Sequence, residues 1–336
     1  PMEKNSSIKQ SKLDDPKGSY TIDSINGASL DFSLVIPQAQ MDAAIQQWLQ
    51  EDHPSWEIGG LVVGCERKSA QLFLKSSGTL AGKPFFESVF RQLDCQVLWE
   101  PHAEEGTAWE KLQSDDIEDD NSDNTSRKIK YRNKVCLAVV EGPVHHILRG
   151  ERTALNILSR CSGVATAARD ARTYLGDWNG WLAGTRKTTP GAFGKVEKYG
   201  LLVGGASTHR LDLSQMVMLK DNHIWSHGSI SQAVKIARRA AGFSQKIEVE
   251  CQSLEDALEA ATAGADIVML DNFPPEQLKR DAKTFKERFP HVLVEASGGI
   301  TNETISQYLS EHVDIVSQGK LTQGYNCLDF SLKISH

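Results

Sequence analysis

Two alternating patterns of apolar positions run through the chain from about residue 143 to residue 324. Short runs rich in branched apolar residues predict strands, and longer stretches with apolar residues three or four apart predict helices between them. The expected strands are residues 181–186, 216–220, 247–251, 266–270, 292–296 and 314–317. Repeated strand–helix units with parallel strands close naturally into an α/β barrel.

The helices expected between these strands include residues 230–241, 254–263, 276–289 and 303–310, and a short extended piece at 207–210 is a candidate for a further strand. A doubly wound open sheet is the alternative. It is weakened because no G-x-G-x-x-G motif follows the first strand, so a dinucleotide-binding version lacks its phosphate turn.

The first part of the chain has a different pattern. Residues 1–20 are expected to be a flexible tail, and residues 21–142 a small α+β domain with helices at 37–50 and 84–93 and strands at 71–75, 95–99 and 135–140. Residues 104–134 show no apolar period and hold an acidic cluster followed by a basic stretch, which indicates a solvated insertion loop.

A long helix at 144–168 opens the barrel domain, which is expected to span residues 143–324. In the last segment, residues 325–336, apolar and polar residues alternate between Asp329 and Ile334. Such alternation is typical of a half-buried strand, so we expect this segment to pack back against the first domain.

The composition narrows the class of protein. Of 336 residues, 40% are apolar and 24% are charged, and 37 basic against 44 acidic residues give a net charge of −7. This is a globular profile, and it argues against a general nucleic-acid or membrane surface. The six cysteines form no C-x-x-C pair, and no apolar stretch is long enough for a bilayer. We expect a cytoplasmic protein, with which a nuclear presence is compatible.

Polar and charged residues follow almost every expected strand. They are Arg186, Lys187, His209, Arg210, Lys220, Glu250, Asp271, Ser297, Gly298 and Gly299. In an α/β barrel the carboxyl ends of the strands carry the active site, whereas any one polar strand end is explained by solvation alone. The repetition in register therefore predicts a site.

The residue types sort by charge. Five of these residues are basic side chains, which repel one another unless an anion lies between them or they pair with Glu197, Asp212 or Asp221. Arginine suits planar carboxylates, so a substrate with several carboxylates or phosphates fits. Glu250 and Asp271 could hold Mg²⁺, bind sugar hydroxyls, or pair with the cations.

The stretch Ser297, Gly298 and Gly299 lies between an expected strand and a helix expected to open near Thr301. Glycine lets the backbone approach a ligand closely, and the free N–H groups at a helix start attract phosphate. The stretch is therefore a candidate phosphate loop, which Gly319 after the last strand could complete.

Five strings resemble one family: E-R-T-A-L-N at 151–156, G-T-R-K-T-T-P-G at 184–191, K-D-N-H at 220–223, L-D-N-F at 270–273 and E-A-S-G-G-I at 295–300. In order and spacing the chain is similar to quinolinate phosphoribosyltransferases, in particular eukaryotic and fungal ones. The resemblance implies an N-terminal α/β sandwich followed by an incomplete, TIM-like barrel with fewer than eight strands. It also implies transfer of a phosphoribosyl group to quinolinate with decarboxylation, for NAD biosynthesis.

The resemblance further implies roles for particular residues. Quinolinate would bind Arg186, His209 and Arg210, with Lys187 and Lys220 between the two substrates. Glu250 and Asp271 would bind the ribose and, directly or indirectly, Mg²⁺, and the phosphate loop would be Ser297, Gly298, Gly299 and Gly319. Lys187, Glu250 and Asp271 would be catalytic. A homodimer or higher homo-oligomer is implied, in which Arg152 reaches the neighbouring subunit's site.

One departure from the family pattern follows T-T-P-G. Relatives often carry an arginine there, whereas this chain reads A-F-G-K at 192–195, so that either Lys195 supplies the charge or a substrate contact is weaker. Two other functions stay open at this point. One is an aldolase or isomerase on the same barrel with Lys187 or Lys220 as Schiff-base lysine. The other is a catalytically inactive relative that acts in binding or assembly.

Overall fold

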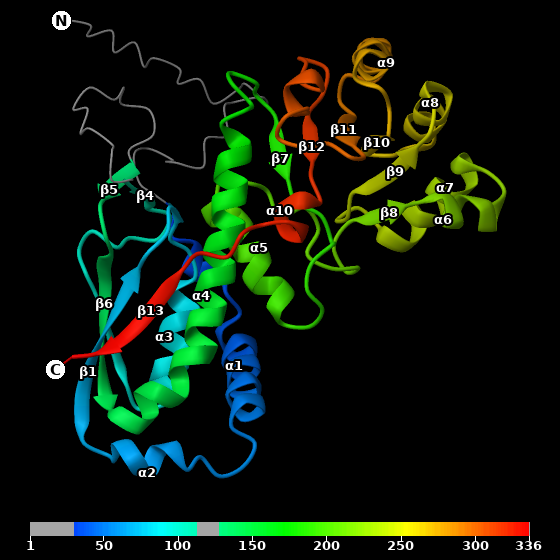
Figure 1. The fold of residues 1–336 in the computed structure, drawn as a ribbon. Helices are drawn as coiled ribbons and strands as arrows, with labels where there is room; N and C mark the ends of the chain where they lie inside the picture. The colour runs from blue at the N-terminus through cyan, green and yellow to red at the C-terminus, as the bar shows by residue number, and fades with distance from the viewer. Residues whose placement is uncertain (1–29, 113–127, 336) are drawn as a thin grey trace, which may run out of the picture.

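The computed structural model of the chain describes residues 30–112 and 128–335. The tail expected at 1–20 and the acidic cluster within 115–123 lie outside these ranges. Figure 1 shows two parts, joined by the long helix α4 (Val144–Arg172), which contacts α3 (Lys83–Arg91) and α5 (Phe193–Val203). Within the described ranges, no helix has both the length and the apolar character needed to cross a membrane.

The second part is a curved sheet of six parallel strands in the order β7-β12-β11-β10-β9-β8 (Figure 1). Its strands are β7 (Trp181–Ala183), β8 (Val217–Leu219), β9 (Ile247–Cys251), β10 (Ile267–Asp271), β11 (Leu293–Ser297) and β12 (Ile315–Ser317). Six strands confirm the expected incomplete barrel. The extended piece at 207–210 contributes a single parallel bridge, from Ser207 to Ala183, rather than a strand.

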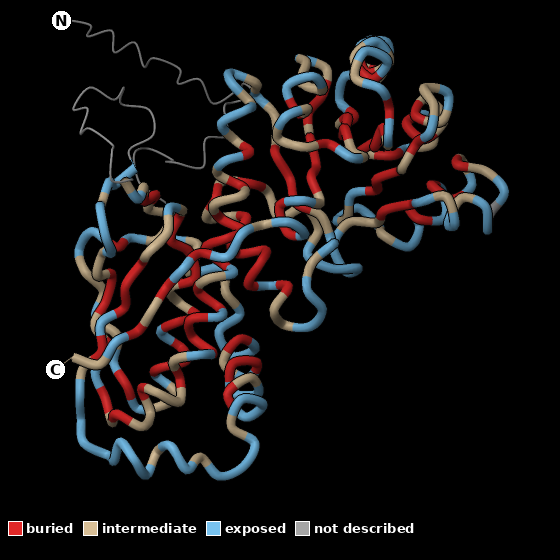
Figure 2. Tube along the Cα trace, viewed as in Figure 1, coloured by how far each residue is buried: buried red, intermediate tan, exposed pale blue. Residues whose placement is uncertain are grey.

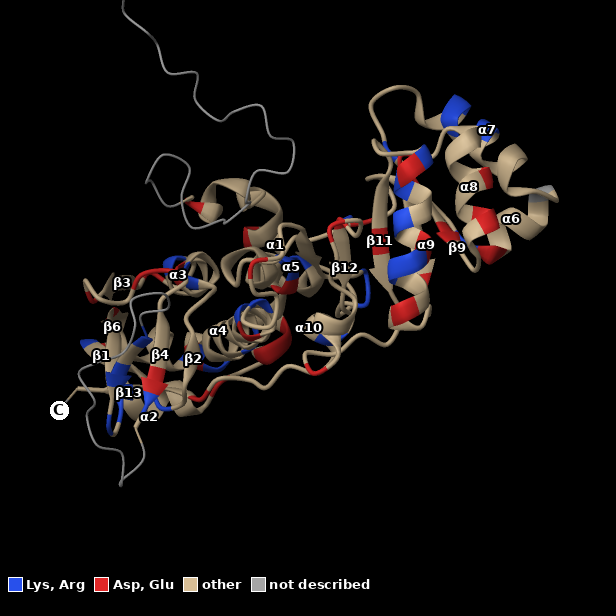
Figure 3. Ribbon diagram, turned by 90° about the horizontal axis from the view of Figure 1, so that it is seen from above, with Lys and Arg blue, Asp and Glu red and all other residues tan. Residues whose placement is uncertain are grey.

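Helices cover the outside of this sheet: α6 (Asp221–His227), α7 (Ile230–Ala241), α8 (Leu254–Ala263) and α9 (Pro275–Arg288), with α10 (Lys320–Gln323) after β12. Figure 2 shows that the strands of this sheet are mostly buried and that the helices around it are largely exposed on their outer sides. Figure 3 shows basic and acidic residues interspersed along α9. Serine caps fix where two of these helices begin, because Ser229 and Ser253 accept hydrogen bonds from backbone N–H groups three residues on.

The expectation of a helix at 303–310 was wrong. The structure has only the 3-10 helix η2 (Ile305–Gln307) there. The hydroxyl of Thr304 accepts a hydrogen bond from the N–H of Thr301, at 3.0 Å, so a side chain takes the place of a helical partner. Helices α5 and α6 were not expected, and β7 ends before Arg186, which leaves that residue in a loop.

The first part contains an antiparallel sheet in the order β13-β1-β6-β3. Its strands are β1 (Arg67–Leu74), β3 (Gln96–Trp99), β6 (Val135–Pro143) and β13 (Phe330–Ile334). The short 3-10 helix η1 (Phe32–Val35), α1 (Gln38–Asp52) and α3 precede or accompany them, and α2 (Gly59–Val63) contacts α4. Apolar residues of α1, α3, α4 and the sheet form one buried cluster.

A second, smaller sheet joins β2 (Gly78–Thr79), β4 (Ala108–Lys111) and β5 (Lys128–Tyr131). The interpretation of 104–134 as a loop throughout was therefore wrong at both ends. Trp109 in β4 is only 1% exposed, and it packs edge-on against Tyr131 of β5. Four-residue strands are too short to show a period, which is why this region looked structureless.

Candidate active site

The carboxyl ends of the parallel strands bring the expected acidic residues to one edge of the sheet. Asp271 and Ser297 are the last residues of β10 and β11 and lie opposite each other in the strand pairing. Glu250 lies one position before the end of β9 and pairs with Met269 of β10. The parallel arrangement follows from the helical crossovers, so the sequence places these groups together without any long-range information.

Two lysines lie beside these carboxylates. Lys220 and Glu250 form an ion pair, Lys220 Nζ to Glu250 Oε2. Burial raises the pKa of Asp271, the charge of Glu250 raises it further, and Lys220 and Lys187 oppose the rise. Two neighbouring carboxylates favour a cation, or hydroxyl groups that donate hydrogen bonds, between them. Carboxylate oxygens are also the ligands that Mg²⁺ prefers.

A second group of charges is wholly basic. Burial, together with the nearby charges of Arg186 and Arg210, lowers the pKa of Lys198 to about 8. Lys198 was not predicted, because a lysine within a helix gives no sequence signal of a site, and this one is only 3% exposed. Arg186, Arg210 and Lys198 repel one another, and a bound anion would relieve this repulsion. The group is therefore a candidate anion pocket.

Two of the three acidic residues considered as partners for these cations, Glu197 and Asp212, are engaged elsewhere. Glu197 is buried and accepts hydrogen bonds from Thr189 N–H at 2.7 Å and from the hydroxyl groups of Thr189 and Tyr325. Asp212 accepts from Ser214 at 2.8 Å. Glu197 thus shapes the loop that carries Arg186 and Lys187, and neither acid forms an ion pair with a cation of the site in the part of the chain that the structure describes.

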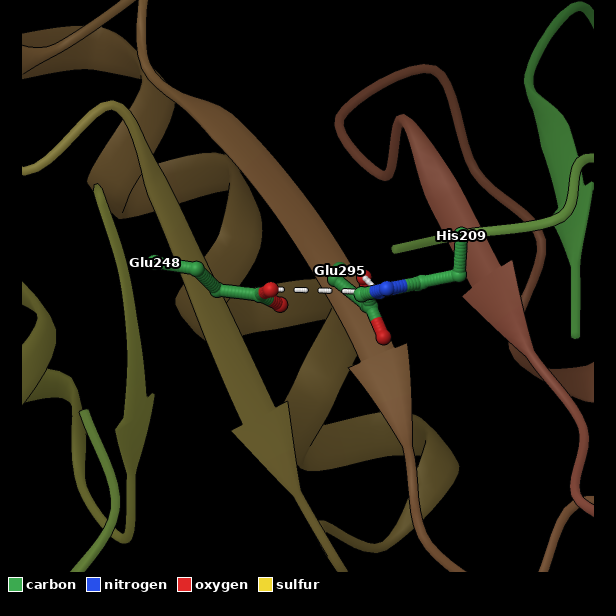
Figure 4. Close-up of side chains that lie close together, drawn as sticks. All are labelled: His209, Glu248 and Glu295. Carbon is green, nitrogen blue, oxygen red and sulfur yellow. Dashed lines mark hydrogen bonds and ion pairs between the residues drawn. The ribbon is translucent and has the colours of Figure 1, made fainter. Parts of the chain in front are cut away.

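His209 differs from the neighbouring cations in that both of its ring nitrogens are hydrogen-bonded within the protein. Its Nδ1 accepts a hydrogen bond from Arg210 N–H at 2.9 Å, and its Nε2 lies 3.0 Å from Glu295 Oε2 (Figure 4). With Nδ1 as acceptor, the proton is on Nε2 and is donated to Glu295. Both ring nitrogens therefore have hydrogen-bond partners within the protein.

Two buried carboxylates inside the barrel were missed. Glu248 and Glu295 are both 0% exposed, and Glu248 Oε2 lies 3.8 Å from His209 Nε2. Burial raises the pKa of Glu248, and the neighbouring Glu295 raises it further. Side chains two apart in a strand share a face, so Glu248 could have been found from Glu250. Attention to strand ends alone overlooked the interior.

His209, Glu248 and Glu295 also form a possible metal-binding group, with ligand atoms within 4.8 Å of one another. The hydrogen bonding of His209 argues against this use. Because Nδ1 already accepts from Arg210, a metal on Nε2 would need a ring with no proton at all. Glu250 and Asp271 are the better candidates for a metal.

The glycine stretch after β11 forms a tight loop. Gly298 has φ +99° and Gly299 φ +61°, and a Cβ atom on Gly298 would lie 2.6 Å from the backbone nitrogen of Asn272. Their N–H groups make no hydrogen bond with another described residue. Successive N–H groups in such a turn form an anion-binding concavity, so the loop suits phosphate although no α-helix follows it.

The remaining predicted residues divide into two sets. Gly319 lies at the site, because Lys187 Nζ is 3.8 Å from the place of a Cβ atom on that glycine. Arg152 is exposed on α4 and makes no hydrogen bond or ion pair with any other predicted site residue in the described ranges. Lys195 contacts Gln40 of α1, so its amine is directed to the first domain rather than to the cations.

Comparison with known proteins gives consistent matches over most of the chain. The family model for the quinolinate phosphoribosyl transferase N-terminal domain matches residues 61–162, and that for the C-terminal domain matches residues 164–333. Rat nicotinate-nucleotide pyrophosphorylase [carboxylating] is 50% identical over 304 residues, which cover 90% of this chain and 93% of the rat protein. The Dictyostelium discoideum protein of that name is 46% identical over 314 residues, covering 91% and 99%.

Solved structures agree with these relatives. A NadC deletion mutant superposes with a TM-score of 0.78 at 33% identity, covering 92% of this chain and 99% of that one. NadC from Streptococcus pyogenes superposes with a TM-score of 0.77 at 32% identity, covering 92% and 100%. The likeness therefore includes both parts of the molecule and the relation between them.

Proposed function

We propose a function from the premise that this chain belongs to the quinolinate phosphoribosyltransferase family, both of whose domain models it matches. It is an enzyme that transfers the phosphoribosyl group of phosphoribosyl pyrophosphate to quinolinate. The products are nicotinate mononucleotide, pyrophosphate and carbon dioxide. The observation that carries the assignment to this site is the pairing of a basic group with two carboxylates at one edge of the sheet.

The basic group is the proposed quinolinate pocket. Arg186 and Arg210 would bind the two carboxylates, since a guanidinium donates two parallel hydrogen bonds to a planar carboxylate. Lys198 is buried near them, and its ammonium group donates hydrogen bonds to the backbone carbonyls of Thr208 and Arg210. The nicotinate ring carries one carboxylate fewer, so it would bind this pocket more weakly.

The acidic pair is the proposed ribose and magnesium site. Glu250 and Asp271 would hold the ribose hydroxyls and, directly or through water, Mg²⁺, and the loop at Gly298 and Gly299 would bind the 5′-phosphate. When bound, Mg²⁺ would neutralise charge on the pyrophosphate. The repulsion between the two carboxylates, seen in the raised pKa of Asp271, supports this use. Omission of Mg²⁺ with chelator present should abolish turnover.

The chemistry needs no protein nucleophile. The ring nitrogen of quinolinate forms a bond to the sugar C1 as the bond from C1 to the pyrophosphate oxygen breaks, and Glu250 and Asp271 would stabilise positive charge on the ribose. The nitrogen is then cationic. When the adjacent carboxylate leaves as carbon dioxide, its electron pair remains on the ring carbon, which takes up a proton. Lys187 would stabilise this step by its charge.

The Schiff-base alternative does not fit the two lysines. A Schiff-base lysine needs an apolar pocket or a neighbour that lowers its pKa. Lys220 forms an ion pair with Glu250, so its amine is already engaged, and Lys187 is exposed. The inactive-relative alternative rested on the stretch 192–195, and Lys195 there contacts α1 instead of the site.

We also propose a homodimer or larger homo-oligomer in which Arg152 completes the neighbouring subunit's site. Arg152 is exposed and separate from the other site residues. Exposed apolar side chains around α2 support an interface on the first part of the molecule: Trp56, Ile58, Leu61 and Val62 are each more than two-thirds exposed. A patch of this kind on a folded protein marks a contact surface.

A cytoplasmic location, with a nuclear presence compatible, and the absence of nucleic-acid partners remain proposals. All six cysteines are free thiols in the structure, as in proteins of reducing compartments. Microscopy of the tagged chain in its cell checks the location.

One experiment tests the function. The full chain is mixed with Mg²⁺, phosphoribosyl pyrophosphate and quinolinate labelled in the carboxylate next to the nitrogen, with nicotinate as the control acid. We expect nicotinate mononucleotide and labelled carbon dioxide in equal amounts from quinolinate, and little product from nicotinate. Absence of the nucleotide, or equal rates with the two acids, would contradict the proposal.

A further inference from the structure

The turn formed by Thr208, His209 and Arg210 has a strained backbone at its centre. His209 has φ +55°, in the left-handed region that residues other than glycine rarely adopt. Such a conformation is strained and persists only where the surroundings hold it. The next residue is Arg210, whose guanidinium is proposed to bind substrate, so whatever holds the turn also determines where that group lies.

A buried acid holds the turn from one side. Glu295 of β11 accepts a hydrogen bond from Nε2 of His209 at 3.0 Å (Figure 4), and Nδ1 of the same ring accepts from Arg210 N–H at 2.9 Å. Glu295 is itself fixed, because Ser317 Oγ donates to its other oxygen at 2.6 Å. A chain of hydrogen bonds therefore runs from β12 through the ring to the backbone of Arg210.

A buried base holds the turn from the other side. Lys198 of α5 donates through Nζ to the carbonyl of Thr208 and, at 3.1 Å, to the carbonyl of Arg210. Lys198 is 3% exposed. Its ammonium group thus ties together the carbonyls of the residues before and after His209, which opposes relaxation of the left-handed residue to extended backbone.

We propose that Glu295 and Lys198 are positioning residues that clamp this turn and so direct Arg210 toward the substrate's carboxylate, and that His209 transmits the clamp from Glu295 to the backbone of Arg210. The inference rests on the proposed function, since it assigns quinolinate to Arg210.

Three variants test the clamp through steady-state kinetics with each substrate varied. Glu295→Met and Lys198→Met keep side-chain length but remove the hydrogen bonds, so we expect the KM for quinolinate to rise about tenfold to a hundredfold. The KM for phosphoribosyl pyrophosphate should stay unchanged, and kcat should fall by less than about threefold. Glu295→Gln keeps an oxygen that accepts from His209, so its quinolinate KM should stay within about threefold of the unchanged chain.

Lys286→Met is the matched control. It removes a buried ion pair with Asp314, at 2.6 Å, in the same barrel, and Lys286 makes no hydrogen bond with Thr208, His209 or Arg210 among the described residues, so the change should lower thermal stability and leave both KM values unchanged. A rise in quinolinate KM equal to that of Glu295→Met would mean that general loosening explains the effect. If Glu295→Met does not fold, Lys198→Met decides, because it breaks the same turn from the other side.

A double-mutant cycle tests the role of His209. Asparagine tolerates the left-handed conformation, so His209→Asn removes the ring without adding strain. If His209 acts through Glu295, the double variant with Glu295→Met should bind quinolinate no more weakly than the worse single variant. If the effects of the two substitutions on quinolinate binding multiply, His209 acts independently of Glu295, which would contradict its role in the clamp.

The outcomes for the clamp and for the function are distinct. An unchanged chain that makes no nicotinate mononucleotide refutes the proposed function. An active unchanged chain whose Glu295→Met and Lys198→Met variants keep the same quinolinate KM refutes the clamp alone.

Discussion

Lys187 is the residue whose charge is proposed to act on the reacting ring. Its carbonyl accepts a hydrogen bond from Thr322 Oγ1 at 2.8 Å, which fixes the backbone, while its amine extends beside Gly319. We predict that Lys187→Ala lowers kcat on the order of 100-fold, because charge stabilisation in the transition state is lost. The KM for quinolinate should change by less than about threefold.

Lys195→Ala is the control for this prediction, since Lys195 is a nearby lysine that contacts Gln40 of α1. Its kcat should be unchanged. Weaker quinolinate binding with full turnover in Lys187→Ala would contradict the role.

Gly298 offers a test of the phosphate loop. At φ +99° an added Cβ atom would meet the backbone nitrogen of Asn272 at 2.6 Å, so the loop must move. We expect Gly298→Ala to raise the KM for phosphoribosyl pyrophosphate at least about tenfold, because the N–H groups that face phosphate are displaced. Gly264→Ala is matched, with φ +103° but open space, and should cost stability only. Equal kinetics in the two variants would exclude the loop.

The ionisation of Glu105 makes the stability of the first domain depend on pH. Burial raises its pKa to about 7, although hydrogen bonds from Gly82 N–H and Lys83 N–H at the start of α3 lower it. Because the folded-state pKa lies above the unfolded value, the stabilisation is fully present below about pH 4.5 and is lost as the pH rises to about 7. Ionised Glu105 is thus less favourable in the folded chain than protonated Glu105.

We therefore predict that the free energy of unfolding of the unchanged chain, minus that of Glu105→Gln, falls by about 1–3 kcal/mol between pH 5 and pH 8. Urea unfolding at several pH values measures this difference. A difference that stays constant or grows with pH would show that burial does not raise the pKa of Glu105.

At the scale of elements, β13 is the segment whose place depends most on distant residues. It pairs antiparallel with β1, and Leu332, 4% exposed, lies opposite Leu72. We predict that Leu332→Ala lowers the free energy of unfolding by about 2–4 kcal/mol, because it leaves a cavity in the first domain. Lys333→Ala, on the exposed face of the strand, should change it by less than about 0.5 kcal/mol. Similar losses in both would contradict the burial pattern.

Elements with long periodic patterns could be predicted closely. Helices at 230–241 and 254–263 and the strand at 247–251 have the bounds that the sequence indicated, because serine caps, glycine ends and apolar period agree there. Elements whose form depends on neighbours could not. The 3-10 helix near Ile305 and the short strands β4 and β5 are set by local hydrogen bonds and by packing of Trp109.

At the scale of the whole molecule, the proposed oligomer predicts that two inactive variants regain activity when their subunits mix. Arg152→Ala and Lys187→Ala should each be nearly inactive. If Arg152 acts on the neighbouring subunit, mixed dimers contain one intact site, so an equal mixture after subunit exchange should recover about a quarter of the unchanged activity. If Arg152 acts within its own subunit, every site in the mixture carries one defect, and no activity returns.

The sequence by itself determined the repeated strand–helix pattern and the charges at the strand ends, because period and side-chain type are local properties. Parallel strands then bring Glu250, Asp271 and Ser297 to one edge whatever the detailed packing. Only the tertiary structure decided what lies behind that edge. The orientation of His209 and the burial of Lys198 and Glu295 depend on three elements meeting inside the barrel, and no local pattern records that meeting.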